Sequence, residues 1–251
     1  MGQDRLPILA VRADDIPPRV LVVGDPARAE RVAGLLDDAD EVGRNREYVT
    51  FRGRHRGTDM AVVSHGVGSA GAAVCFEELC RGGAQRLIRA GTAGGLQDDV
   101  VDGALVVVRA AVRDEGVTAR LVPPGYPAVA DVDVVTTLRT VAAGAGQDVV
   151  EGVVLTSDLF YPHSVLGGDL QLWQRAGVVA VEMECAALFV TAALHGAAAG
   201  AILAIDGNPL REGDDDMSGY DPHRDGVVDA VDRMIAITLD ALTAPVGPPR
   251  G

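Results

Sequence analysis

RVLVVGDP, residues 19–26, is a strand-like run that stops abruptly at a turn. Its first five residues include three valines, which favour a pleated and buried strand. Gly24, Asp25 and Pro26 then break the strand pattern, and residues 27–36 follow a helical one. A strand joined to a helix by a short turn is the building unit of parallel α/β sheets. The stretch therefore predicts a buried strand with a helix packed behind it.

The same alternation continues along the chain. Further strands are expected at residues 61–64, 86–88, 105–109, 153–156 and 201–205, and further helices after the glycine turn to about residue 80, at 182–194 and at about 226–242. This order predicts an α/β layer architecture with a largely parallel sheet. Ligands of such sheets bind beyond the carboxyl ends of the strands, so the residues after each strand carry the candidate site.

Composition agrees with one domain of moderate size. The chain has 251 residues, 48% of them hydrophobic and only 4% aromatic, so its core must be built from small and branched side chains. We expect a single domain over residues 1–243. Residues 244–251 have the composition of a disordered tail.

The formal net charge of −14 disfavours nucleic acid and anionic membranes as partners. It also repels phosphate, so an anion site in this chain needs its own cluster of positive charge. All 22 basic residues are arginine, which excludes mechanisms that depend on a lysine. We attribute the absence of lysine to the base composition of the genome rather than to function.

Three cysteines, at positions 75, 80 and 185, lie in apolar segments that are predicted to be helical. We expect them to be reduced core thiols in a cytoplasmic protein. No apolar run reaches the roughly 18 residues that a membrane span requires, and no signal peptide is apparent. No His, Cys, Asp and Glu set has metal-ligand spacing, so we expect no metal.

A glycine-rich turn, GVGSAG at residues 66–71, matches the dinucleotide fingerprint between a strand and a helix. That fingerprint also requires an acidic residue after the next strand, where this chain has Arg89-Ala90-Gly91-Thr92. An NAD(P)-binding oxidoreductase therefore remains an outside alternative. A tight turn that lets a ligand approach the backbone, with His65 supporting it, is favoured.

Two strand ends carry an arginine beside a small or glycine-rich turn. Gly24 and Arg28 follow the first strand, and Arg89 and Thr92 follow the third. Guanidinium groups, a hydroxyl and backbone N–H donors are what a free phosphate needs. A surface ion pair is the structural alternative for any one arginine, but the repeat of the arrangement favours an anion site.

Six motifs in this order resemble the hexameric nucleoside phosphorylase family, and most closely its purine nucleoside phosphorylases. They are VLVVGDP at 20–26, NREY at 45–48, SHGVGSAG at 64–71, IRAGT at 88–92, VEME at 181–184 and IDGNP at 205–209. The resemblance covers about residues 8–240. It implies a three-layer αβα sandwich with a mixed central sheet. It also implies an enzyme of purine salvage that cleaves a purine nucleoside with inorganic phosphate as co-substrate and needs no cofactor. Members of the family form homohexamers built as trimers of dimers, so a cytoplasmic homohexamer is expected.

The resemblance also implies roles for individual residues. The phosphate-binding residues would be Gly24, Arg28, Arg89, Thr92 and, reaching into a neighbouring subunit, Arg46. The ribose would be bound by Glu184 through its hydroxyls and by Met183 from beneath. The base pocket would be formed by Val67, Ala93, Gly94 and Tyr161. Asp206 would act as the catalytic acid at the purine N7, and the apolar run before it suits a carboxyl whose pKa must rise.

Three positions depart from the family. Ile8 stands where a histidine usually reaches the ribose 5′-hydroxyl, which predicts tolerance of 5′-methylthio or 5′-deoxy nucleosides. The Gln and Arg that read uracil are absent after Phe160-Tyr161-Pro162, which disfavours uridine. Glu212 occupies the place of a pocket tryptophan. A uridine phosphorylase, or a nucleosidase that uses water, remain the alternatives on the same fold.

Overall fold

The computed structural model describes residues 5–162, 165–211 and 224–245. Its strands are β1 (Arg5–Leu6), β2 (Val11–Arg12), β3 (Arg19–Val23), β4 (Asp37–Asn45), β5 (Tyr48–His55), β6 (Thr58–Ser64), β7 (Arg86–Gly95), β8 (Leu105–Asp114), β9 (Ala128–Val129), β10 (Val150–Ser157), β11 (Ala180–Glu182) and β12 (Ala198–Gly207). Its helices are α1 (Pro26–Ala33), α2 (Ser69–Arg81), α3 (Thr118–Leu121), α4 (Val132–Gly144), α5 (Leu170–Arg175), α6 (Cys185–Leu194) and α7 (Asp225–Leu242), with a 3₁₀ turn at Ala13–Asp15.

One large sheet runs through the molecule in the order β11-β10-β8-β12-β7-β3-β6-β5-β4. Strands β3, β6, β7 and β12 are parallel, whereas β8 is antiparallel to β12, so the sheet is mixed as predicted. In addition β11 pairs antiparallel with the end of β7, where Ala180 lies opposite Gly95. This extra pairing closes β7, β12, β8, β10 and β11 into a barrel beside the open half of the sheet.

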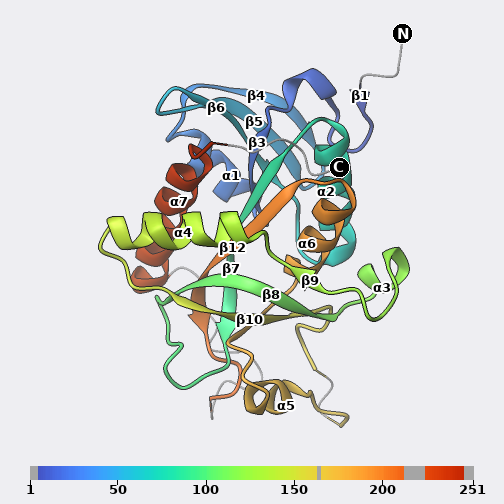
Figure 1. The fold of residues 1–251 in the computed structure, drawn as a ribbon, viewed down its shortest axis with the longest axis vertical. Coiled ribbons are helices and arrows are strands. Elements are labelled where there is room, and N and C mark those ends of the chain that lie inside the picture. The colour runs from blue at the N-terminus through green and yellow to red at the C-terminus, as the bar shows by residue number, and fades with distance from the viewer. Residues whose placement is uncertain (1–4, 163–164, 212–223, 246–251) are drawn as a thin grey trace.

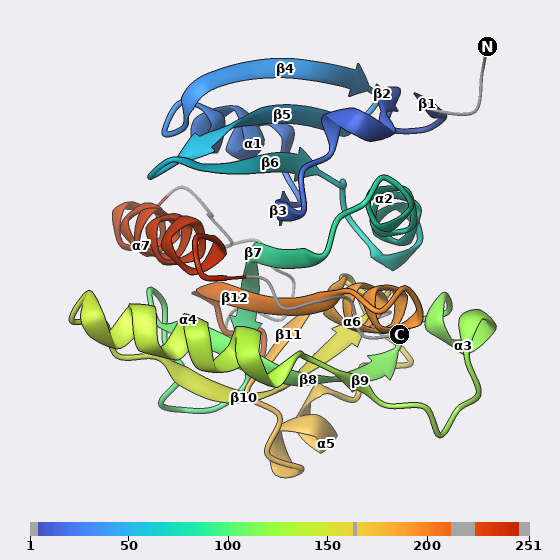
Figure 2. The same ribbon diagram turned by 45° about the horizontal axis from the view of Figure 1, so that its top comes forward.

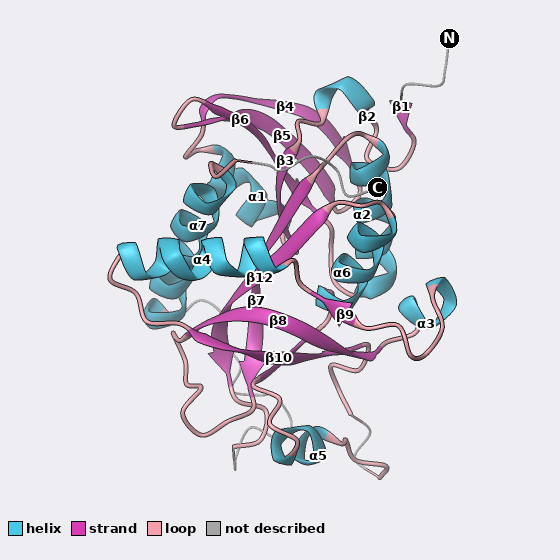
Figure 3. Cartoon of the chain, in the orientation of Figure 1, coloured by secondary structure: helices cyan, strands magenta, loops and turns pink. Residues whose placement is uncertain are grey.

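Helices cover the sheet on two sides, which confirms the three-layer arrangement (Figures 1 and 2). Helix α7 packs on β12, β7 and β3, with α4 beside it, while α2 and α6 pack together on the other side. Figure 3 shows the strands running between these two groups of helices. The valine-rich run of β3 is completely buried, because both of its faces are covered.

Three of the boundaries that differ from the sequence predictions lie at the candidate site. Arg89 and Thr92 do not follow a strand but lie within β7, which continues to Gly95 because β12 pairs along its length. Asp206 lies within β12 rather than after it. Glu182 belongs to β11, and helix α6 begins only at Cys185. Pairing with neighbouring strands decides these limits, and local sequence does not carry that information.

Several elements were not predicted, including the β4–β5 hairpin and helix α4. At the carboxyl end, the carbonyls of Ala244 and Pro245 accept hydrogen bonds of 2.9 and 2.8 Å from Arg86. These two residues of the predicted tail are thus attached to Arg86 at the start of β7, and residues 246–251 lie outside the described residues. Among the described helices, none combines the length and the apolar character needed to cross a membrane.

Candidate active site

A cavity of about 790 Å³ opens where the ends of β3, β7, β11 and β12 meet. Most of the residues predicted for the site line it: Gly24, Arg28, Val67, Arg89, Thr92, Ala93, Gly94, Met183, Glu184 and Asp206. Segments that are far apart in the sequence therefore supply one continuous surface. Arg46 and Tyr161 are the predicted site residues that do not line this cavity.

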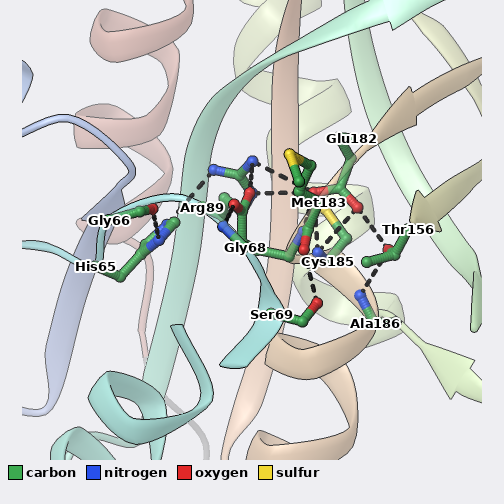
Figure 4. A network of polar contacts seen from close by, with 11 residues as sticks. His65, Gly66, Gly68, Ser69, Arg89, Thr156, Glu182, Met183, Cys185 and Ala186 are labelled. Carbon is green, nitrogen blue, oxygen red and sulfur yellow. Dashed lines mark hydrogen bonds and ion pairs between the residues drawn. The ribbon is translucent and has the colours of Figure 1, made fainter. Parts of the chain in front are cut away.

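Arg89 is the central charge of the cavity floor, and its guanidinium group is held by two carboxylates (Figure 4). Its Nη2 donates to Glu184 Oε2 at 2.5 Å, and its Nε donates to Glu182 Oε2 at 3.3 Å. All three side chains are at most 5% exposed. Burial alone would lower the pKa of Arg89, but the two carboxylates outweigh it and raise that pKa above its ordinary value. Arg89 is thus a fixed cation in the cavity floor.

Gly91 leaves the space that the Arg89 side chain occupies. A Cβ atom on Gly91 would lie 2.5 Å from Arg89 Nη1 and 2.6 Å from its Cζ, closer than any real contact. The side chain of Arg89 therefore folds over the backbone two residues further along the same strand. The glycine of the RAGT motif is needed for this close approach and not for a turn.

Glu182 organises the start of helix α6. Its carboxylate accepts hydrogen bonds from the N–H groups of Glu184 (2.8 Å) and Cys185 (2.9 Å) and from the Thr156 hydroxyl (2.5 Å), besides Arg89. These contacts satisfy backbone donors that a helix start leaves free. Glu182 is therefore occupied by the protein itself, which leaves Glu184 as the carboxylate that faces a ligand.

Glu184 is held from the opposite side by the glycine-rich turn. The N–H of Gly68, the residue before helix α2, donates to Glu184 Oε1 at 2.5 Å, and the Ser69 hydroxyl donates to the Met183 carbonyl at 2.6 Å. Burial raises the pKa of Glu184, and Arg89 opposes that rise. Each carboxylate oxygen has one protein donor and retains a lone pair, so Glu184 can accept two hydroxyl groups. Because the Gly68 N–H donates to Glu184, the turn does not offer this N–H to the phosphates of a dinucleotide.

Asp206 lies at an irregularity of β12. The pairing with β7 shifts register between Ile205 and Gly207, which is a β-bulge at Asp206. Bulges redirect a side chain out of the strand pattern, and Asp206 lines the cavity while only 4% exposed. Its backbone carbonyl accepts a hydrogen bond of 2.7 Å from Arg224, which also pairs with Asp102 at 2.8 Å. The carboxyl is thus presented from a fixed backbone.

Gly24, Arg28 and Thr92 complete the end of the cavity around Arg89. The Gly66 N–H donates to the Gly24 carbonyl at 3.0 Å, which ties the two glycine turns together. Arg28 lies on helix α1, directly after the turn, and Thr92 on β7. Two arginines and a hydroxyl thus line the same cavity, and these are groups that a tetrahedral anion needs.

Arg46 and Tyr161 are exposed and lie outside the cavity lining. Arg46 is exposed at the tip of the β4–β5 hairpin, in the left-handed region at φ 54°. Tyr161 is 70% exposed, and its ring lies edge-on to Phe160, which lines the cavity in its stead. The segment that replaces the tryptophan, from Glu212 onwards, lies outside the described residues.

Sequence inspection missed several lining residues. They include Glu47, Asp102, Asp114, Phe160, Asn208 and Arg224. Glu47 and Phe160 adjoin predicted positions, so their neighbours Arg46 and Tyr161 were the available signal. Asp114 and Arg224 reach the cavity only through barrel closure and the packing of α7, which no local pattern reveals.

Comparison with known proteins finds close similarity over nearly the whole chain. A family model described as the phosphorylase superfamily matches residues 18–243. The chain is 39% identical over 236 residues to the purine nucleoside phosphorylase of Plasmodium falciparum, which covers 93% of this chain and 94% of that protein. It is 37% identical to the guanosine phosphorylase of Halorubrum lacusprofundi, with 95% and 98% covered. The crystal structure of the Toxoplasma gondii purine nucleoside phosphorylase in complex with immucillin-H superposes with a TM-score of 0.91, at 33% identity and 96% coverage of each chain.

Proposed function

The chain belongs to the phosphorylase superfamily, and we propose on that basis that it is a purine nucleoside phosphorylase. It cleaves inosine or guanosine with inorganic phosphate and releases the free base and ribose 1-phosphate. The observation that carries this proposal is a single cavity that holds three kinds of group. Arg28, Arg89 and Thr92 suit phosphate, Glu184 suits ribose hydroxyls, and Asp206 suits a base nitrogen.

The chemistry requires this arrangement. As the bond from C1′ to N9 breaks, positive charge develops on the ribose and the bonding electrons leave with the base. A phosphate oxygen, held by Arg28 and Arg89, forms the new bond to C1′ and stabilises the developing cation. Asp206 donates its proton to N7 and so neutralises the departing base. The residues present supply each of these steps, so we propose that no cofactor or metal takes part.

We propose further that each site is completed by a neighbouring subunit, in a homohexamer built as three dimers. Arg46 supports this proposal because it is exposed and lies outside the cavity of its own chain. Ile8 is tied to the same hairpin, since its carbonyl accepts a hydrogen bond of 2.7 Å from Asn45. Its N–H donates to Glu78 at 2.9 Å, which fixes the segment on helix α2. Ile8 and Arg46 would then enter the neighbouring site together.

The preferred substituent at the 5′ position of the ribose is a separate proposal. An apolar Ile8 near the ribose 5′ position offers no hydrogen bond to a hydroxyl, so 5′-methylthio or 5′-deoxy nucleosides are proposed as good substrates. A cytoplasmic location and a role in purine salvage are proposals of the same kind, since they rest on the family. The cavity contains Phe160 and Asp206, and the sequence directly after Phe160-Tyr161-Pro162 lacks the Gln and Arg that read uracil, so uridine is the weaker candidate.

The decisive experiment is phosphate-dependent cleavage of inosine, guanosine and uridine, with products separated by chromatography. We expect equimolar base and ribose 1-phosphate, and no release without phosphate. Equal release of base in the absence of phosphate would instead identify a nucleosidase. Binding of NAD(P) measured on the same preparation tests the oxidoreductase alternative, for which we expect none.

A further inference from the structure

His65 lies beneath the cavity and is completely buried, at 0% exposed, directly after strand β6. Its ring meets Phe76 of helix α2 edge-on, with centroids 5.3 Å apart. Its Cε1 lies 3.9 Å from the position that a Cβ on Gly24 would take. The ring therefore fills the space under the phosphate end of the cavity, although it does not line the cavity itself.

The contacts of the ring determine its tautomer. Nδ1 lies 2.8 Å from the carbonyl oxygen of Gly66, which can only accept a hydrogen bond. Nδ1 must therefore carry the proton, and in the neutral ring Nε2 is an acceptor. Burial, together with Arg89 and Arg28, lowers the pKa of His65 well below its ordinary value. The ring is thus a neutral group with a fixed lone pair.

That lone pair faces Arg89. His65 Nε2 lies 3.5 Å from Arg89 Nη1, on the side of the guanidinium group away from Glu182 (Figure 4). Each of the three guanidinium nitrogens then has at least one partner. Nε and Nη2 each lie 3.3 Å from Glu182, Nη2 also lies 2.5 Å from Glu184, and Nη1 lies 3.5 Å from His65. Three partners fix both the position and the plane of the group.

We propose that His65 is a positioning residue for phosphorolysis, which holds the Nη1 edge of Arg89 so that the guanidinium group faces the bound phosphate. The inference rests on the proposed function and adds a residue to it. A neutral acceptor is the suitable partner at this place, because Arg89 already faces two carboxylates. A third carboxylate would add a further negative charge and repel phosphate, whereas the imidazole gives direction without charge.

Two substitutions of His65 test the inference, because one removes the hydrogen-bonding nitrogens of the ring and the other replaces them. H65F keeps a ring against Phe76 but removes both nitrogens, and H65Q keeps a neutral amide that can donate to Gly66 and accept from Arg89. We expect H65F to raise the KM for phosphate about tenfold, the worth of one hydrogen bond to a charged group. Measured at saturating phosphate, the KM for inosine should change less than twofold. H65Q should retain most of the phosphate affinity. His195, at the end of helix α6, provides the control substitution H195F, for which no change is expected.

The outcomes separate the inference from the proposed function. If the wild type shows no phosphate-dependent cleavage, the function itself is wrong. If the wild type is active and H65F leaves the phosphate KM unchanged, or raises both KM values equally, the positioning role is overturned. Should H65F fail to fold, the ring nitrogens of wild-type His65 decide by NMR at neutral pH: the neutral Nδ1–H tautomer supports the role, and an imidazolium or Nε2–H tautomer refutes it.

Discussion

Arg89 and Glu184 form a buried ion pair at 2.5 Å that joins the residue proposed for phosphate to the residue proposed for ribose. The two side chains come from β7 and from the turn before α6, and each is 5% exposed. A ligand at either residue therefore changes the surroundings of the other. Binding of phosphate and binding of nucleoside are expected to depend on one another through this pair.

The first prediction concerns Arg89 itself. R89A should lower kcat/KM by about 10²-fold or more, because it removes a charge-assisted contact to the nucleophile. It should also lower the free energy of unfolding by about 3–5 kcal/mol, since two buried carboxylates lose their cation. Steady-state kinetics and urea unfolding measure the two effects.

A double substitution separates them. R89A combined with E184Q removes one of the stranded charges, so stability should recover in part while activity does not. Full activity in either variant contradicts the role of Arg89. An unchanged stability contradicts the buried pair.

The second prediction concerns Gly91. G91A places a methyl group where the Arg89 guanidinium lies, so it should displace that side chain and raise the KM for phosphate about tenfold or more. G144A is the matched control, because outside the adjoining backbone of helix α4 no described atom lies within 4 Å of the added Cβ. It should leave kinetics unchanged. A normal phosphate KM in G91A means that Arg89 does not need this space.

The third prediction uses the lowered pKa of His65. The unfolded chain takes up a proton on this histidine below about pH 6.5, whereas the folded protein, with Arg89 of β7 and Arg28 of α1 nearby and uncharged Phe76 of α2 against the ring, does not. Stability is therefore retained above pH 6.5 and lost as the pH falls below it, by up to about 1.4 kcal/mol per pH unit. Urea unfolding at pH 7.5, 6.5 and 5.5 should show a shallower dependence in H65Q than in the wild type. Parallel curves for the two proteins would mean that His65 titrates normally.

The fourth prediction concerns shared sites. R46A and D206A should each be inactive on its own, R46A because its arginine acts in the neighbouring site. Subunits of the two variants that are unfolded and refolded together should regain about a quarter of the wild-type sites, since half of the dimers are mixed and each has one complete site. Homodimers refolded separately are the control. A mixture that stays inactive, or an R46A protein with normal kinetics, contradicts the shared site.

Local sequence predicted which segments supply the site residues, but not the contacts that position their side chains. The strand of residues 19–23 and its helix were predictable because their buried valines and the Gly-Asp-Pro turn act over a few residues. Arg89 and Asp206 were expected after strands and instead lie within them, since long-range pairing of β7 and β12 extends both. The bulge at Asp206 and the closure of β11 onto β7 are also long-range features. Family resemblance named residues that the cavity brings together, but only the packing reveals the contacts of Arg89 with Glu182 and His65.

The last prediction is the substrate preference. Asp206 can donate to a purine N7, an atom that uridine lacks, so inosine or guanosine should be cleaved faster than uridine. D206A should reduce purine turnover far more than binding, because the acid acts in the transition state. Ile8 leaves the 5′-hydroxyl without one hydrogen bond, worth on the order of 1 kcal/mol or about fivefold in relative preference, so 5′-methylthioinosine or 5′-deoxyinosine should compete well with inosine. I8H restores a donor and should shift the kcat/KM ratio back towards inosine by a similar factor. If uridine is the best substrate and D206A is harmless, the purine assignment and the acid role are both wrong, whereas an unchanged ratio in I8H overturns only the account of the 5′ position.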